Sequence, residues 1–181
     1  MLKAIYIAGV PASGKSLIMR RIRGCVFKDA SQFQHGCLRG LKDGNFWTYG
    51  VFDGSLFEGT DKLSMCVIND ALAHVETLQK DVQKHVLILE GDRLFNERFL
   101  KAARATVIVV DAAEPTLRMR HALRKDNQTE TRLKACRTKV ENFCKKHRVS
   151  RLFNNKPADL ERIVGKILSI ASNYLAEPAQ P

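Results

Sequence analysis

Short runs of consecutive apolar residues alternate along the chain with longer stretches whose apolar residues recur every three or four positions. The runs at 4–8 (AIYIA), 85–89 (HVLIL) and 106–110 (TVIVV) predict buried strands, and shorter runs at 25–27 and 149–153 predict two more. Strands that are apolar throughout are typical of a parallel sheet covered on both faces, so the pattern predicts an α/β fold.

The stretches between these runs predict amphipathic helices. One begins at a predicted N-cap, Thr60, with apolar residues following at helical spacing. A basic helix begins at Glu114, and a second one follows a break at 126–131. The other predicted helices cover 15–23, 96–103 and 157–175, whereas the window 29–59 shows neither period.

The chain has 181 residues, which fits one domain over 1–176 followed by a short tail, 177–181. No run of apolar residues is long enough to cross a membrane, and the amino-terminal run predicts a strand rather than a signal peptide. Its five cysteines include no CxxC pair, so a disulfide framework or a zinc ribbon is not indicated. The expected location is the reducing cytoplasm.

The octapeptide GVPASGKS, residues 9–16, carries the clearest chemistry. It matches G-x-x-x-x-G-K-[ST] and lies between a predicted strand and a predicted helix, as this motif requires. Its glycines let backbone N–H groups turn inward around phosphate oxygens. We expect Lys15 to contact the β- and γ-phosphates of ATP, and Ser16 to bind Mg²⁺. The predicted nucleotide-binding residues are Gly9, Val10, Pro11, Ala12, Ser13, Gly14, Lys15 and Ser16.

Several protein classes use such a loop. The segment 155–159 (NKPAD) is similar to a guanine-binding motif, but its aspartate lies one place too far along, and larger P-loop motors need a longer chain. Over nearly its whole length the chain resembles the nucleoside- and nucleotide-kinase-like branch of the P-loop proteins. This resemblance implies a three-layer fold with a five-stranded parallel sheet in 2-3-1-4-5 order. It also implies phosphoryl transfer from ATP to a hydroxyl or a phosphate.

Two carboxylates fit a kinase. Glu90 and Asp92 follow the predicted strand at 85–89, which in that sheet order lies beside the P-loop strand. We expect Glu90 to hold Mg²⁺ and Asp92 to be a candidate for accepting the proton of an attacking hydroxyl. The alternative is a capped strand end with an ordinary surface ion pair.

The basic stretch 115–137 resembles the helical lid of these kinases. Arg120 and Arg124 lie one helical turn apart, with Arg118 near them and Arg132 across the break. The resemblance implies that such arginines close over ATP and neutralise charge as the γ-phosphoryl group leaves. It places Arg120 and Arg124 in catalysis and Arg118 in nucleotide binding. The alternative is a basic, solvated helix.

The window 29–59 occupies the place where the family builds its acceptor pocket. Seven of the thirteen aromatic residues lie between 27 and 57. They predict either a surface that stacks nucleic-acid bases or a small hairpin around 46–52 with its own core. Asp29 and Asp53 are the candidates in this window for the catalytic base.

The net charge of +11 is concentrated in one stretch. Residues 93–151 hold 16 Lys and Arg against 6 Asp and Glu, whereas residues 1–92 and 152–181 are close to neutral. A field of this kind attracts a polyanion such as nucleic acid. The alternative is a set of solvated helix faces with arginines for one nucleotide.

The combination of GVPASGKS, LFEGTDKLS (56–64) and LEGDRLFNERFL (89–100) narrows the resemblance. It is similar to phage-type P-loop kinases that phosphorylate 5-hydroxymethyl-deoxyuridine within DNA. The resemblance implies ATP and Mg²⁺ as cofactors, DNA as the partner and, for a phage protein, the host cytoplasm. Three alternatives remain: a kinase of free nucleosides or nucleotides, a 5′-hydroxyl polynucleotide kinase, and a nucleotide-binding protein without catalysis. The oligomeric state is not indicated.

Overall fold

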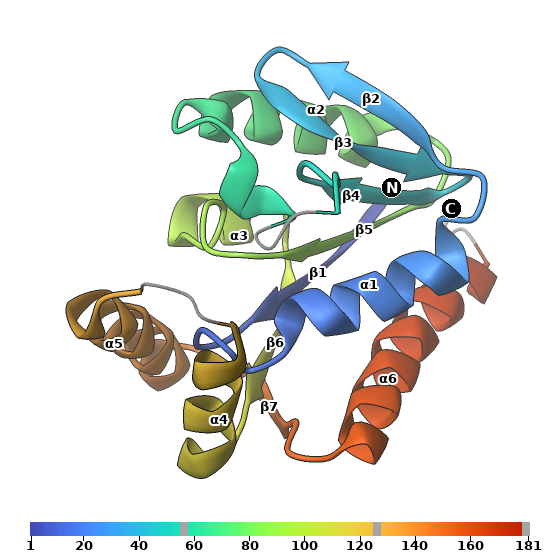
Figure 1. The fold of residues 1–181 in the computed structure, drawn as a ribbon. Coiled ribbons are helices and arrows are strands. Elements are labelled where there is room, and N and C mark those ends of the chain that lie inside the picture. The colour runs from blue at the N-terminus through green and yellow to red at the C-terminus, as the bar shows by residue number, and fades with distance from the viewer. Residues whose placement is uncertain (55–57, 125–127, 179–181) are drawn as a thin grey trace.

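A mixed sheet forms the centre of the molecule, which is shown as a computed structural model describing residues 1–54, 58–124 and 128–178 (Figure 1). Over these residues seven strands pair in the order β2-β3-β4-β5-β1-β6-β7. The strands are β1 (Leu2–Ala8), β2 (Ser31–His35), β3 (Leu38–Asp43), β4 (Phe46–Tyr49), β5 (His85–Glu90), β6 (Thr106–Asp111) and β7 (Ser150–Phe153).

The predicted sheet of five strands is therefore corrected to seven, with a different order. Strands β4, β5, β1, β6 and β7 run parallel to one another, whereas β3 is antiparallel to both of its neighbours, β2 and β4. The strand predicted at 25–27 is wrong, because helix α1 continues through Val26. Val26 lies one helical turn after the buried Ile22, so this short apolar run extends the buried face of the helix.

Helices cover both faces of the sheet, as the apolar strands predict. Helices α1 and α6 lie on one face and α2 and α3 on the other, while α4 and α5 stand at the end where β1 meets α1 (Figure 1). Along β1, Ile5 and Ile7 pack toward α1 and α6, and Ala4 and Tyr6 pack toward α2 and α3. The helices are α1 (Lys15–Val26), α2 (Val67–Lys80), α3 (Glu97–Ala102), α4 (Glu114–Arg124), α5 (Glu130–Lys146) and α6 (Pro157–Ala176).

The helix predicted from Thr60 begins later than expected. Residues Thr60–Lys62 form a short 3₁₀ turn, η1, and α2 starts only at Val67. The Thr60 hydroxyl donates to the backbone carbonyl of Glu90 at 2.8 Å, rather than capping a helix. This hydrogen bond holds η1 against the end of β5.

Three aromatic residues of the 29–59 window, Phe33, Trp47 and Tyr49, pack in the core rather than forming a base-stacking surface. Trp47 and Tyr49 are 8% and 1% exposed, and both pack edge-on against Phe33. The imidazole of His74 on α2 stacks on Phe33 and hydrogen-bonds the Tyr49 hydroxyl at 2.8 Å. These rings therefore belong to a core, as the hairpin alternative predicted, but the antiparallel strands span 31–49 and not a hairpin around 46–52. Phe57 lies outside the described residues.

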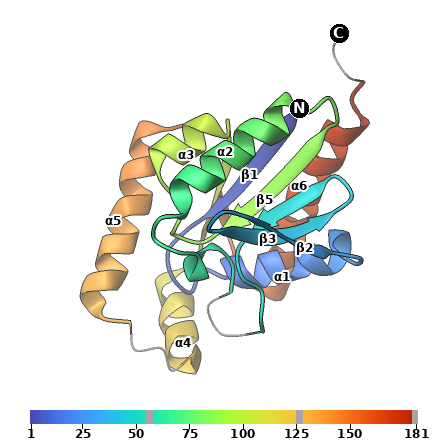
Figure 2. The same cartoon turned by 90° about the horizontal axis from the view of Figure 1, so that it is seen from above.

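Figure 2 shows that α4 and α5 lie on the opposite side of the molecule from the β2–β3 hairpin. Between them, the carboxyl ends of the parallel strands and the amino terminus of α1 face the same region. In the described part of the chain, no helix is both long and apolar enough to cross a bilayer.

Candidate phosphate-binding and catalytic site

The loop between β1 and α1 is folded by its own lysine and by close backbone packing. The Lys15 ammonium donates to the carbonyl oxygens of Gly9 and Val10, both at 2.9 Å. Gly14 has φ 99°, and a Cβ atom there would lie 2.2 Å from Asn154 Nδ2. A side chain would therefore displace both the loop and its support, so glycine is required at this position.

Two polar side chains hold the outer side of this loop. The Arg120 guanidinium donates to the carbonyl oxygens of Ala12 and Ser13 at 3.3 and 3.2 Å, and to that of Asn154 at 2.9 Å. The buried Asn154 amide donates to Ser13 O at 2.9 Å. Arginine and asparagine thus satisfy the carbonyl groups on one side of the loop, which leaves its N–H groups on the other side for an anion.

Glu90 is the most buried carboxyl at the site. It ends β5, is 4% exposed, and has its pKa raised to about 7, chiefly by burial. The nearby Lys15 ammonium opposes this rise, the Asp61 carboxylate adds to it, and a hydrogen bond with the Ser16 hydroxyl again lowers the pKa. The Ser16 hydroxyl and the Glu90 carboxyl are therefore neighbouring oxygen donors, the ligand type that a hard metal ion prefers.

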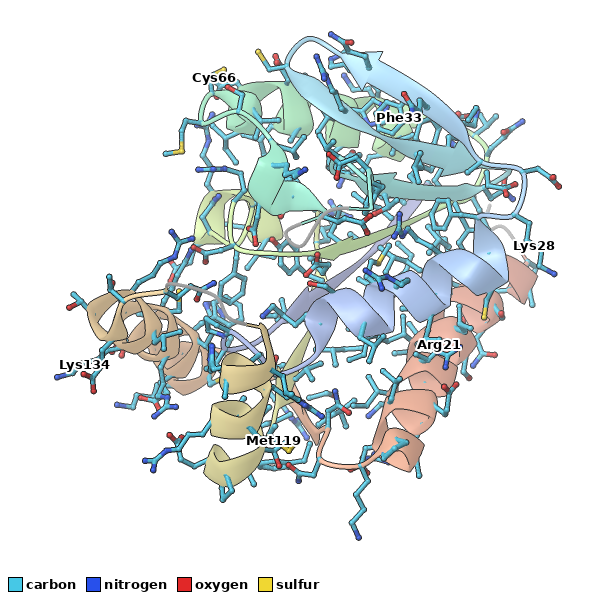
Figure 3. The ribbon with its side chains drawn as sticks, viewed as in Figure 1. Arg21, Lys28, Phe33, Cys66, Met119 and Lys134 are labelled. Carbon is cyan, nitrogen blue, oxygen red and sulfur yellow. The ribbon has the colours of Figure 1, made fainter. Side chains whose placement is uncertain are left out.

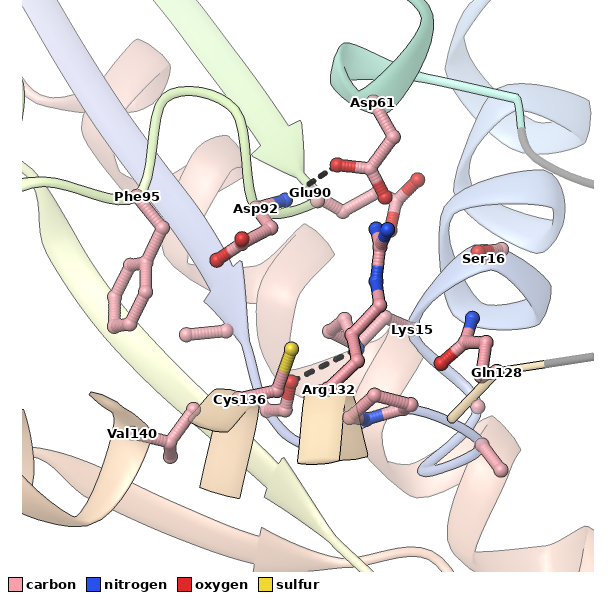
Figure 4. Close-up of a pocket in the computed structure, with 16 residues that line it drawn as sticks. Lys15, Ser16, Asp61, Glu90, Asp92, Phe95, Gln128, Arg132, Cys136 and Val140 are labelled. Carbon is pink, nitrogen blue, oxygen red and sulfur yellow. Dashed lines mark hydrogen bonds between the residues drawn. The ribbon is translucent and has the colours of Figure 1, made fainter. Parts of the chain in front are cut away.

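Asp61 and Asp92 complete a group of three carboxylates. Asp61 Oδ1 accepts the backbone N–H of Asp92 at 2.6 Å, which joins η1 to the segment after β5. The Asp92 carboxylate pairs with Lys139 of α5 at 2.6 Å. Figure 4 shows Asp61, Glu90 and Asp92 together at one side of the pocket.

Helix α5 supplies the opposite wall of the same pocket. Its Arg132 side chain reaches toward the carboxylates, with Cys136 and Val140 below it (Figure 4). Gln128, just before α5, also lines the pocket. The phosphate-binding loop, three carboxylates and a cationic helix thus border one cavity.

The structure does not bring Asp29 or Asp53 to this pocket. Asp29 lies beyond the far end of α1, roughly 16 Å of helix away from the loop, and its backbone N–H donates to Asp43. Asp53 is exposed, pairs with Lys62 at 2.5 Å, and lines a separate hollow beside the β2–β3 hairpin. The misplaced second strand explains the assignment of Asp29, because β4 rather than 25–27 is the neighbour of β5.

The predicted lid arginines are distributed differently from the expectation. Arg120 contacts the backbone of the phosphate-binding loop, while Arg118 is exposed, pairs with Glu114, and lines a neighbouring hollow. The side chain of Arg124 lies outside the described part of the structure. Arg132, across the break, is the arginine that lines the main pocket.

A sequence profile of the family P-loop Nucleotide Kinase3 matches residues 1–168. The chain belongs to the P-loop Nucleotide Kinase3 family. Family membership makes it a P-loop phosphotransferase of the nucleoside and nucleotide kinase class. No curated protein sequence matches this kinase.

A solved deoxyadenosine kinase from M. mycoides, with products dCMP and a flexible dCDP bound, is similar in structure. It shares 12% sequence identity, with 92% of this kinase and 99% of that chain covered and a TM-score of 0.43. At that TM-score, the family match remains the finding that decides the class.

Asp61 is the site residue of this kinase that the sequence did not reveal. It was expected in the first turn of a helix, and its signal was the pair of glycine-flanked acidic segments GTD and EGD. Those segments meet because Gly59 and Gly91 both have positive φ and pack against Glu90 and Asp61, respectively. Packing between segments that lie far apart in the sequence leaves no periodic pattern that could predict it.

Proposed function

We propose that this kinase transfers the γ-phosphoryl group of ATP to a hydroxyl group on nucleic acid. The proposed acceptor is the 5-hydroxymethyl group of 5-hydroxymethyluracil in DNA. The observation that carries the proposal is the position of α5: a helix with exposed basic residues forms one wall of the pocket that also contains the phosphate-binding loop. The exposed basic residues of α5 are Arg132, Lys134, Arg137, Lys139, Lys145 and Lys146.

The loop would hold the triphosphate of ATP. The loop N–H groups and the amino terminus of α1 would bind phosphate oxygens, and Lys15 would exchange its carbonyl contacts for phosphate. Ser16 and Glu90 fit Mg²⁺, since a hydroxyl and a carboxylate are ligands this ion accepts. When bound, the ion would offset negative charge on the phosphates.

The other carboxylates and Arg132 would act on the transferring group. Asp92 or Asp61 would orient the acceptor hydroxyl and receive its proton, because both carboxylates face the pocket beside the loop. Arg132 would neutralise charge on the phosphoryl group as it moves. Arg120 would keep the loop in shape without contacting the nucleotide.

A polymeric acceptor would explain why α5 carries more positive charge than the binding of one nucleotide requires. Phosphates on either side of the modified base would lie along α5 and reach its exposed lysines and arginines. In duplex DNA the base would leave the stack to reach the pocket, at a cost of a few kcal/mol. The buried rings of the β2–β4 region would then support the acceptor side rather than stack on the base.

Labelled ATP and four acceptors would test the proposal. The protein would be incubated with γ-labelled ATP and hydroxymethyluracil DNA, unmodified DNA with 5′-hydroxyl ends, RNA, or free nucleosides. We expect label on hydroxymethyluracil DNA, in a form that exonuclease digestion recovers on the modified nucleoside.

Label on any other acceptor alone would contradict the proposed acceptor. Label on free nucleosides alone would indicate a small-molecule kinase, and label on 5′ ends alone would indicate a polynucleotide end kinase. Lys15→Ala serves as the catalytic control, because it removes the ammonium beside the loop while leaving α5 unchanged. Label that persists in Lys15→Ala would come from a contaminating kinase.

A further inference from the structure

Two cysteine thiols from distant parts of the chain touch each other. Cys37 lies in the turn between β2 and β3, and Cys66 directly precedes α2. Their sulfur atoms are 3.4 Å apart, and both residues are exposed. Figure 3 shows Cys66 at the periphery of the molecule, next to the end of the hairpin.

The backbone on each side of this contact is held in place. The N–H of Cys37 donates to Asp70 Oδ2 on α2 at 2.6 Å. Gly36 has φ +58°, and a Cβ atom there would lie 2.5 Å from the same oxygen. The turn therefore packs directly against the first residues of α2, so the thiol contact follows from a fixed approach of two elements.

The two thiols have different acidities. Hydrogen bonding with the Ser64 hydroxyl, 2.9 Å away, and with the Cys37 thiol lowers the pKa of the Cys66 thiol. The contact with Cys66 raises the pKa of the Cys37 thiol. Because the thiolate is the nucleophile, Cys66 is the sulfur that reacts first.

The other three cysteines have no such arrangement. Cys25 lies on α1, which is separate from the hairpin and from α2. Cys136 and Cys144 lie on α5 at positions separated by about 12 Å of helix rise. That separation exceeds what a disulfide can bridge without backbone movement.

We propose that Cys37 and Cys66 form a reversible disulfide that ties the β2–β3 hairpin to the start of α2. The oxidant is a low-molecular-mass disulfide. The Cys66 thiolate attacks one of its sulfurs, the S–S bond breaks, and one thiolate leaves and takes up a proton. Cys37 then loses its proton to water and attacks Cys66 Sγ, which expels the second small thiolate. Two protein thiols are oxidised, and one small disulfide is reduced to two thiols.

The disulfide would affect the candidate site through the short segment that joins Asp61 to Cys66. Asp61 lies in η1, Cys66 ends the short connection from η1 to α2, and Asp61 accepts the N–H of Asp92. A covalent tie at Cys66 would restrict the motion of this connection. The disulfide does not depend on the proposed acceptor, because its formation is measured on the protein itself.

Thiol counting and peptide mapping would test the bond. The folded protein would be incubated with oxidised glutathione, its free thiols alkylated, and its peptides analysed by mass spectrometry. We expect loss of two free thiols, a peptide linking Cys37 to Cys66, and full recovery of both thiols with dithiothreitol. Retention of all five thiols, or a linkage between any other pair, would overturn the proposal.

Variants separate this pair from general thiol reactivity. Cys25→Ser, an exposed control on α1, should still lose two thiols, whereas Cys66→Ser should form no internal disulfide. Cys37→Ser should stop at a mixed disulfide between glutathione and Cys66. Circular dichroism would verify that these variants fold, and an internal disulfide that persists in Cys66→Ser would contradict the assignment.

Hydrogen exchange would test the effect on the segment. Amides between Asp61 and Cys66 should exchange more slowly in the oxidised protein than in the reduced protein, with no change in α6. Cys66→Ser treated in the same way should show no difference. Equal exchange in both forms of the wild-type protein would refute the restriction of this segment.

Discussion

Asp61 and Asp53 belong to the same connection between β4 and α2, yet their surroundings differ. Asp61 accepts the N–H of Asp92 and lies in the pocket beside Glu90, where its charge adds to the raised pKa of that carboxyl. Asp53 pairs with Lys62 in a separate hollow. At the scale of single residues, position in the fold places Asp61 at the pocket and keeps Asp53, the candidate base named from the sequence, away from it.

Substitution of these two aspartates should separate the two assignments. Asp61→Asn should lower turnover by roughly 10²–10⁴-fold, because it removes a carboxylate that faces the pocket. Asp53→Asn should change turnover by less than about threefold, since it removes only an exposed ion pair. Steady-state kinetics on the labelled acceptor measure both, and the reverse ranking would restore Asp53 as the base.

His74 predicts a pH-dependent stability. The His74 side chain is buried against Phe33 and shares one hydrogen bond with the Tyr49 hydroxyl. It also lies near His35 and His85. Burial, and then repulsion by these two histidines, lowers its pKa from 6.5 to about 4. The unfolded chain therefore binds a proton more readily, so stability is complete above pH 6.5 and falls as the pH drops toward 4.

Urea unfolding at two pH values would measure this effect. Between pH 7 and pH 5 the His74 contribution should lower the free energy of unfolding by about 2 kcal/mol. His74→Phe should be less stable at both values, because Tyr49 loses its partner, but should lack this part of the pH difference. His147→Gln, at an exposed position directly after α5, should retain the wild-type difference. A His74→Phe protein with an unchanged difference would contradict the prediction.

At the scale of elements, prediction succeeded where burial follows a regular period. Strands β1, β5 and β6 were predicted because they are apolar throughout and buried on both faces of the sheet. Helices α2 and α6 were predicted because the apolar residues that pack on the sheet recur at helical spacing. The β2–β3 hairpin was not predicted, since its strands are short, β2 is largely exposed at the sheet edge and β3 is only partly buried. The loop at 9–16 was recognised from its motif, while the pocket around it depends on contacts between distant elements.

The contact between α4 and the phosphate-binding loop yields a prediction for Arg120. Arg120→Ala should raise the KM for ATP by about tenfold or more, because three backbone carbonyls lose a charged donor. Arg21→Ala, an exposed arginine of α1 paired with Glu161, should leave this KM unchanged. An Arg120→Ala enzyme with normal KM and reduced turnover would instead place the side chain in the transfer step.

At the scale of the whole molecule, the most basic stretch of the chain includes α5, the helix that forms one wall of the pocket. The excess of Lys and Arg over 93–151 could be counted from the sequence, but its placement could not. The fold brings α5 beside the carboxylates at the strand ends, so Arg132 lines the pocket and the other exposed basic side chains of α5 lie on a helix that borders it. Lys134, on the same helix, extends away from the body of the protein (Figure 3).

This arrangement predicts a salt-dependent acceptor interaction that maps to α5. The KM for a DNA acceptor should rise steeply between about 50 and 200 mM salt, because binding releases counterions from phosphates. Lys134→Glu should reduce the slope of log KM against log salt by about 1, the amount expected for one lost phosphate contact. Lys166→Glu changes the net charge by the same amount at an exposed position of α6, and it should leave this slope unchanged. Equal loss of slope in both variants would indicate attraction by net charge alone, and a wild-type KM insensitive to salt would favour a free nucleoside as acceptor.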